Sequence, residues 1–265
     1  MSRGWQFFGY LRLARLVLVL LALLYGWGEF SRSPRGGDEV TPPTSRPLPA
    51  LPGEFSASHD ARDADGFTAL MRAVWRRDAS RVVVHELVQA GADVNARGPN
   101  GETPLMIAAA WAVDPGVVVV LLSAGADVNA RGPLSVTALM MTVTENANPA
   151  VVKALLGAGA ELEARTDNGE TALMLAAAVN PNPEVLRVLL AAGADLEARD
   201  DLHSTALMLA AEWNSSPDAV ATLLDAGADG AARDYLGRTA FHFAQENPAL
   251  RDTDIYWRLS DARFR

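Results

Sequence analysis

The residue types that usually carry catalysis or bind metals are few in this sequence, and they are not grouped. There is no cysteine and a single lysine, Lys153. The lack of cysteine excludes disulfides, thiol nucleophiles and thiolate metal sites, and a lysine inside an expected helix does not serve a phosphate-binding loop. The histidines stand far from any nucleophile or second metal ligand: His59, His85, His203 and His242. We therefore predict a protein that is not an enzyme, with no catalytic residue, cofactor or metal site.

Two groups of carboxylates are better explained as recurring turn positions than as sites. The first precedes Gly66 and has a faint likeness to a calcium loop, but it lacks the alternation of ligands and the distal bidentate glutamate; it consists of Asp60, Asp63 and Asp65. The second recurs at fixed places after expected helices, which argues against acid–base pairs; it consists of Glu161, Glu163 and Glu197.

The elements that would position any site come from a repeated phrase. Its closing glycines lie 34 residues apart, at Gly91, Gly125, Gly159, Gly193 and Gly227. Its opening threonines are Thr68, Thr103, Thr137, Thr171, Thr205 and Thr239. A fixed period of this length predicts a repeat architecture, in which each unit packs only on its neighbours.

Each unit is expected to hold two short helices. Thr-Ala/Pro-Leu-Met opens the first, since the threonine hydroxyl can accept from free backbone N–H groups. The second follows a residue with the same capping ability, namely Ser80, Asp114, Asn148, Asn182 or Ser216, and in four units a proline comes next. Helices of this size are too short to stand alone in water, because about 12–15 residues are needed for even marginal stability. They are therefore predicted to exist only by stacking on neighbouring units.

The repeated words resemble those of ankyrin-repeat proteins. The matching segments are Asn100-Gly-Glu-Thr-Pro-Leu105, Asn168-Gly-Glu-Thr-Ala-Leu173, Ala90-Gly-Ala-Asp-Val-Asn-Ala96 and Ala124-Gly-Ala-Asp-Val-Asn-Ala130. The resemblance implies an all-α solenoid of about six helix-turn-helix units with projecting turns and a concave binding face. The expected domain is 63–265, with repeats at about 63–97, 98–131, 132–165, 166–199, 200–233 and 234–260.

This sequence departs from the family pattern at several places. Methionine replaces the family's histidine in five units, and histidine returns only at His242. Ser135 and His203 stand where the turn glycine is usual, so those two turns are expected to differ in shape. The methionines and the Asn-Pro caps are similar to those of exported bacterial members of the family.

In this family, the turns and the exposed end of the first helix usually hold the partner, so the resemblance selects the candidate site. The candidate turn positions are Phe67, Glu102, Glu170 and Arg238, and the candidate helix-end positions are Trp75, Arg76, Trp111, Glu145, Glu212 and Trp213. Exposed tryptophan is enriched at binding hot spots. The alternative is that each indole only covers the neighbouring unit.

The charge of the repeat region bears on the kind of partner. Residues 63–265 carry 16 basic and 27 acidic side chains, a net charge of −11. Such a surface repels phosphate backbones, so nucleic acid is not an expected partner. A protein of unknown identity is expected instead, bound to a monomeric chain.

The region before the repeats predicts export. Arg3, Arg12 and Arg15 precede an apolar run at 16–28, which is shorter than the ~20 residues that span a bilayer. We therefore expect residues 1–30 to be a cleaved signal peptide or a short membrane anchor, and this is the only contact with a membrane that we expect. Residues 31–62 hold six prolines and are expected to be a disordered linker. The protein would be periplasmic or secreted, or anchored in the inner membrane with its repeats outside the cytoplasm.

Two functions fit these observations. The first is a non-enzymatic interaction module, exported to the cell envelope and binding a partner protein on its concave face. The alternative is a structural or chaperone-like envelope scaffold without a single defined partner.

Overall fold

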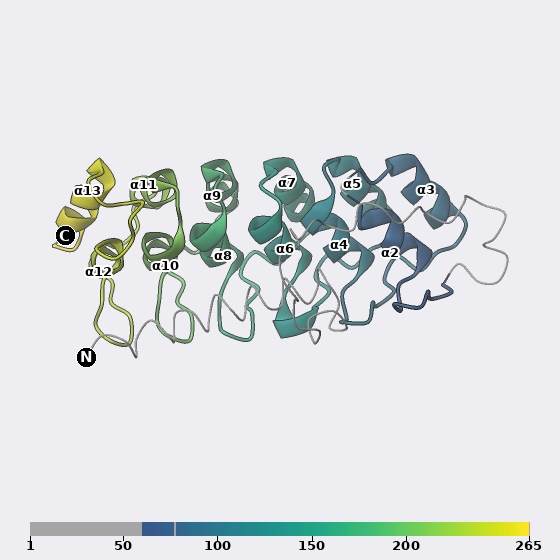
Figure 1. Ribbon diagram of the computed structural model, residues 1–265, viewed down its shortest axis with the longest axis horizontal. Helices are drawn as coiled ribbons and strands as arrows, with labels where there is room; N and C mark the ends of the chain where they lie inside the picture. Colours follow the sequence, from purple (N-terminus) through teal and green to yellow (C-terminus); the bar gives the residue numbers. More distant parts are fainter. Residues whose placement is uncertain (1–59, 77, 265) are drawn as a thin grey trace, which may run out of the picture.

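The computed structural model describes residues 60–76 and 78–264, and the expected signal or anchor at 1–30 and nearly all of the expected linker lie outside these residues. Over the described residues the fold is all-α, with twelve α-helices and no strand. They form six pairs that follow one another along a single axis (Figure 1). The expected solenoid of about six helix-turn-helix units is confirmed.

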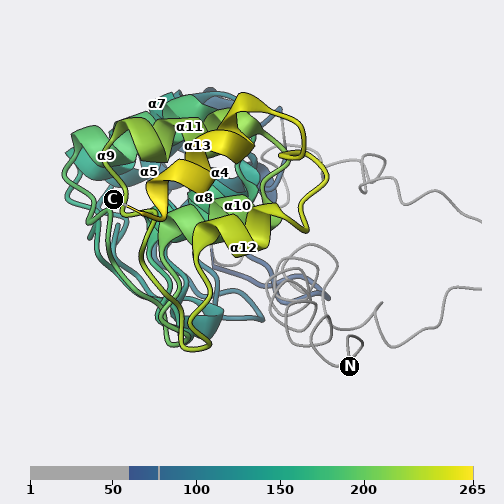
Figure 2. The same ribbon diagram turned by 90° about the vertical axis from the view of Figure 1, so that its left-hand side faces the viewer.

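The first helices of the units form one layer and the second helices form the other (Figures 1 and 2). The first layer consists of α2 (Ala69–Val74), α4 (Pro104–Trp111), α6 (Ala138–Glu145), α8 (Ala172–Val179), α10 (Ala206–Trp213) and α12 (Ala240–Ala244). The second layer consists of α3 (Arg81–Gln89), α5 (Pro115–Ser123), α7 (Pro149–Gly157), α9 (Pro183–Ala191), α11 (Pro217–Asp225) and α13 (Asp254–Ala262). Figure 2 shows the turns leaving this double layer on the side of the first helices. We call the surface made by the first helices and the turns the concave face.

The expected capping residues begin the helices. In the first four units the threonine hydroxyl accepts from the backbone N–H three residues on, as Thr171 does from Met174 at 3.4 Å. In the sixth unit the N–H of Thr239 donates to His242 Nδ1 at 3.1 Å. Asp114, Asn148 and Asn182 cap the second helices with their side chains, whereas Ser80 and Ser216 make no such bond.

One contiguous apolar core runs through the array between the two helix layers. Leucines and methionines fill it, with Leu105, Met140, Leu173 and Leu189 at most 1% exposed. Alanines such as Ala108 and Ala176 are fully buried where first helices approach one another. At the C-terminal end, α13 buries Leu259 and leaves Trp257 63% exposed. The outer face of this last helix thus combines Trp257 with exposed charged side chains, namely Asp254, Arg258 and Asp261.

At four of the turns, an arginine at the start of the turn links successive units. The guanidinium of Arg131 donates to the carbonyl oxygen of Ser135 in its own turn and to that of Arg165 in the next unit, at 3.1 and 2.9 Å. Arg97, Arg165 and Arg199 make the same pair of bonds. We call this series the arginine ladder. Arg62 already makes the bond within its own turn, and Asp60 accepts from the N–H of Asp93, so the repeat contacts begin slightly before residue 63.

A second series of bonds joins the ends of the first helices. Asn146, Asn180, Asn214 and Asn247 each donate their side-chain amide to carbonyl oxygens of the preceding unit. Asn180 Nδ2, for example, lies 2.7 Å from the oxygen of Val143. The side-chain oxygen of each also accepts from the N–H two residues on. We call this series the asparagine ladder.

Two turns were expected to differ in shape because Ser135 and His203 replace the usual turn glycine. The turn at His203 keeps the common shape. His203 takes a φ of 59°, in the left-handed region that Gly101, Gly169 and Gly237 use in their turns. Ser135 takes the same φ, but there the preceding residue, Leu134, also has a positive φ of 53° and lies in the short 3-10 helix η1 (Pro133–Ser135). The third turn is thus the one that differs.

Among the described residues, no helix combines the length and the apolar character needed to cross a membrane. The apolar run at 16–28 lies outside those residues.

Candidate functional site

Three of the candidate turn positions are not exposed at turn tips. The exposed fractions of Phe67, Glu102 and Glu170 are 5%, 2% and 9%, so these three candidates are buried and do not offer a free surface to a partner. Each immediately precedes its capping threonine. The side chain at this position lies in the stem of the turn, where the chain enters the helix layer, rather than at the tip.

The fourth candidate turn position, Arg238, is half-buried and engaged within its own unit. Its guanidinium pairs with the carboxylate of Asp234 at 2.8 Å and lies over the ring of Phe243, 4.4 Å from the centroid. Asp234 also accepts the backbone N–H of Arg238, at 2.8 Å. This arginine therefore stabilises the sixth turn.

The three candidate tryptophans lie where the first helices end on the concave side. Trp75, Trp111 and Trp213 are half-buried and pack against the core. The ring of Trp75 also meets that of Phe67 edge-to-face, with centroids 4.8 Å apart. Each indole thus covers neighbouring structure with one part and presents another part to solvent.

The charged candidates at the helix ends lie in unlike surroundings. Arg76 is exposed and pairs with Asp78 at 2.8 Å. Glu145 and Glu212 are half-buried, and burial raises the pKa of the Glu145 carboxyl above its ordinary value. The fold therefore disfavours the negative charge of Glu145.

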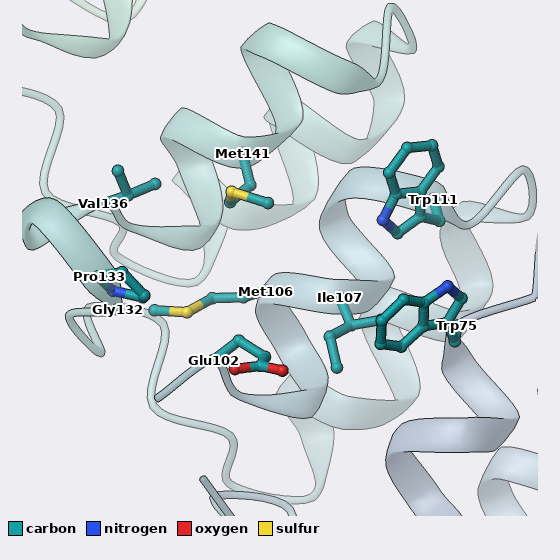
Figure 3. A pocket seen from close by; sticks show the side chains of 9 residues that line it. All are labelled: Trp75, Glu102, Met106, Ile107, Trp111, Gly132, Pro133, Val136 and Met141. Carbon is teal, nitrogen blue, oxygen red and sulfur yellow. The ribbon is translucent and has the colours of Figure 1, made fainter. Parts of the chain in front are cut away.

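The structure brings three of the ten candidates together in one hollow between the first three units (Figure 3). The hollow offers about 380 Å³ of empty space, including the open part at its mouth. Its lining consists of Trp75, Glu102, Met106, Ile107, Trp111, Gly132, Pro133, Val136 and Met141. The other seven candidates do not line it, namely Phe67, Arg76, Glu145, Glu170, Glu212, Trp213 and Arg238.

Glu102 is the single charged residue of that lining. Its Oε2 accepts the N–H of Asn100 at 2.9 Å, whereas its Oε1 has no hydrogen-bond partner among the described residues. Burial raises the pKa of the Glu102 carboxyl, although hydrogen bonds from backbone N–H groups and the charge of Arg62 act in the opposite direction.

Sequence reasoning missed the apolar part of the hollow. Met106, Ile107 and Met141 follow their capping threonines by three or four residues and read as ordinary core positions in the sequence. The one available signal was Pro133. The residues at its place in later units, Asp167, Asp201 and Tyr235, donate their N–H to the preceding turn, which a proline cannot do.

The recurring carboxylates make structural contacts. Asp63 lies 2.6 Å from Nε of Arg72, and Asp65 pairs with the same guanidinium. Glu163 and Glu197 accept the backbone N–H groups of Asp195 and Asp229 in the following units. Within the part of the chain that the structure describes, no three His, Cys, Asp or Glu side chains are grouped as a metal site would need. His59 lies outside that part, and His85 and His203 are exposed.

Comparison with known proteins agrees with this architecture. The family model for ankyrin repeats (three copies) matches residues 50–132, 139–234 and 180–259. Over 73 residues, the chain is 42% identical to the 2-5A-dependent ribonuclease of Mus musculus, which corresponds to 27% of this chain and 10% of that enzyme. The chain thus spans about a tenth of the length of this relative. Because the family matches cover well over half of the chain and the structure repeats the same helix pair six times, the chain belongs to the ankyrin-repeat family.

Proposed function

We propose that this protein is a non-enzymatic interaction module that binds a partner protein on its concave face. The observation that carries the proposal is that three half-buried tryptophans lie at the ends of first helices, and that two of them, Trp75 and Trp111, line the hollow of the first three units. Ankyrin repeats suggest a protein-binding module, and tryptophan is enriched among the hot spots of protein interfaces. The similarity to the ribonuclease covers too little of that enzyme for its activity to enter the proposal.

The proposed setting is the cell envelope of a bacterium. Basic residues before the apolar run at 16–28 and a proline-rich stretch after it support export, with the repeats on the far side of the membrane. Fractionation of cells that express the full chain separates the two forms. A soluble product that starts near Glu29 means a cleaved signal, and an intact membrane-bound product means an anchor. A full-length product in the cytosol would contradict export.

The binding proposal is tested by affinity capture with the full chain from an envelope extract of its own organism, followed by mass spectrometry. Replacement of Trp111 or Trp213 by alanine should weaken capture of the same partner by about tenfold or more, because each removes a large contact from the concave face. Circular dichroism should show that helix content is retained.

The matched control is Arg187→Ala, on the exposed side of the second helix α9. It should leave capture unchanged. If the tryptophan variants capture the partner as well as the control does, the partner binds on a surface other than the concave face. If the natural chain enriches no defined partner, an envelope scaffold without a single partner becomes the better description.

A further inference from the structure

The lining of the hollow includes a buried carboxylate, one oxygen of which accepts no hydrogen bond from the described residues. Glu102 is 2% exposed, and its Oε1 is one of two buried side-chain oxygen or nitrogen atoms without a partner among the described residues. Leaving a buried acceptor without a hydrogen bond destabilises the fold, and the cost is larger when the acceptor is charged. Such a group marks a place where a ligand could supply what the protein does not.

The fourth unit shows why the second one leaves this oxygen unmet. Glu170 occupies the same repeat position as Glu102, and its Oε2 lies 3.1 Å from the hydroxyl of Thr166. The second unit has Gly98 at the place of Thr166. A β-carbon on Gly98 would lie 2.6 Å from the carboxyl carbon of Glu102. The glycine therefore removes the internal donor and also makes the room that the carboxylate occupies.

The cations near this end of the array are engaged elsewhere. Arg72 pairs with Asp63 and Asp65, and Arg76 pairs with Asp78. Arg62 attracts the Glu102 carboxylate through its charge, but its Nη1 donates to the carbonyl oxygen of Gly66 at 2.7 Å. The hollow thus combines one negative charge with apolar walls, and its lining includes no basic side chain.

The walls suit a flat cation. Figure 3 shows the indoles of Trp75 and Trp111 at one end of the hollow, Gly132 and Pro133 at the other, and the Glu102 carboxylate along its edge. A guanidinium is planar, is less strongly hydrated than an ammonium, stacks on aromatic rings and presents several N–H donors to a carboxylate. The apolar stem of an arginine side chain can also lie along methionine and isoleucine.

We propose that the hollow receives an arginine side chain from a basic segment of the partner protein, with its guanidinium donating to Glu102 and stacking beside the two indoles. This inference rests on the proposed function, because it names the chemistry of the partner on the same face. The net charge of −11 over residues 63–265 favours approach of a basic segment. An anionic ligand would be repelled by the same carboxylate, since the lining includes no basic side chain.

The test uses NMR of the full chain carrying ¹⁵N-labelled tryptophan, titrated with the capped tripeptide acetyl-Leu-Arg-Leu-amide. The indole N–H signals of Trp75 and Trp111, assigned from single tryptophan substitutions, should shift and saturate. The tripeptide with citrulline, which keeps the shape of arginine without its charge, should bind at least about fivefold more weakly, since charge-assisted hydrogen bonds are roughly twice as strong as neutral ones. The lysine tripeptide should also bind more weakly, because an ammonium neither stacks on an aromatic ring nor donates two parallel hydrogen bonds to a carboxylate.

Three variants locate the effect. Glu102→Gln should abolish the preference for arginine over citrulline. Gly98→Thr should weaken arginine binding in two ways, because its β-carbon displaces the Glu102 carboxylate from the room that it occupies and its hydroxyl supplies the internal donor that Thr166 gives to Glu170. The control Glu170→Gln should change nothing, since Glu170 does not line the hollow.

The inference is overturned if the arginine tripeptide shifts neither indole, if lysine or citrulline binds equally well, or if Glu102→Gln and Glu170→Gln behave alike. Capture of the partner separates this failure from that of the proposed function. Capture that depends on Trp111 and Trp213 but not on Glu102 leaves the concave-face proposal standing and removes the arginine site. If substitution of Trp111, Trp213 or Glu102 leaves capture unchanged, the partner does not bind on the concave face. Both the proposed function and the proposed partner arginine are then wrong.

Discussion

At the scale of single residues, a difference at one position decides what a buried carboxylate does. Glu102 and Glu170 share a repeat position, and the residue four places earlier is Gly98 in one case and Thr166 in the other. The threonine hydroxyl gives Glu170 an internal donor at 3.1 Å, whereas Glu102 keeps one oxygen unmet. The carboxylate at this position therefore accepts a hydrogen bond within its own turn in the fourth unit, whereas in the second unit one of its oxygens has no donor among the described residues.

This difference predicts a pH-dependent stability. Burial raises the folded-state pKa of Glu102 above its ordinary value of 4.5, so folding favours the protonated form. The stabilising contribution is therefore complete below pH 4.5 and is lost as the pH rises through the folded pKa. Glu102→Gln should melt at a higher temperature than the natural chain at pH 7, and the gap should narrow towards pH 4. Thermal melts over this range would contradict the prediction if the variant were the less stable one at pH 7.

The burial and contacts of single side chains at the site were the hardest features to predict from the sequence. The tryptophans could be found because large aromatic side chains at helix ends stand out in a repeat of small ones. The burial of Phe67, Glu102 and Glu170 could not be found, because position in a motif does not say whether a side chain points to the stem or the tip of a turn. The hollow itself depends on side chains from three units and on the turn at Pro133, and this proximity is a property of the stacked array.

At the scale of elements, the asparagine ladder fixes each first helix to the one before it. Asn214 is 2% exposed, donates to the carbonyl oxygens of Ala177 and Asn180 at 2.9 and 3.1 Å, and accepts from the N–H of Ser216 at 2.8 Å. The amide therefore closes the end of one helix and starts the connection to the next. In the second unit Ala112 takes this position, so the series begins only with Asn146.

Replacement of Asn214 by alanine should lower the free energy of unfolding by about 1–3 kcal/mol, because it leaves buried backbone groups without partners. Urea denaturation of the full chain measures this loss as a lower midpoint. Asn168→Ala is a suitable comparison, since the bond from the N–H of Asp201 goes to the backbone oxygen of Asn168. Its effect should stay within about 0.5 kcal/mol. Equal effects of the two substitutions would show that the ladder does not contribute to stability.

The helices themselves were predictable for local reasons. A capping residue, a proline in the first turn and a glycine at the end each satisfy or remove free backbone groups of a helix. Because these signals recur with one period, the first residue, the last residue and the neighbouring helix can be predicted together for each helix. The run Val117-Val-Val-Val120, which has strand-like residues, lies within α5 because its place in the repeat outweighs its propensity. The asparagine and arginine ladders were not predictable in the same way, since their bonds reach residues more than thirty positions away.

At the scale of the whole molecule, stability should be shared among neighbours rather than held by one centre. Leu189 is fully buried in α9, and Leu189→Ala should cost roughly 2–5 kcal/mol. In a stacked array the damage should spread mainly to the adjoining units. Hydrogen exchange measured by mass spectrometry should therefore show faster exchange in α8 to α11 and little change in α2 to α4. Uniform loss of protection from one end of the array to the other would contradict this picture.

The two ladders point in opposite directions along the array. Each arginine donates to the unit that follows, and each asparagine donates to the unit that precedes. A unit therefore gives an arginine bond to the unit that follows and an asparagine bond to the unit that precedes, and this pair of bonds is the same at each interior junction that both ladders cross. A genetic event that duplicated or removed one such segment would leave a chain whose junctions could bond as before. Over generations, the array can thus change in length, and with it the extent of its binding face, while the hollow near its first units is inherited intact.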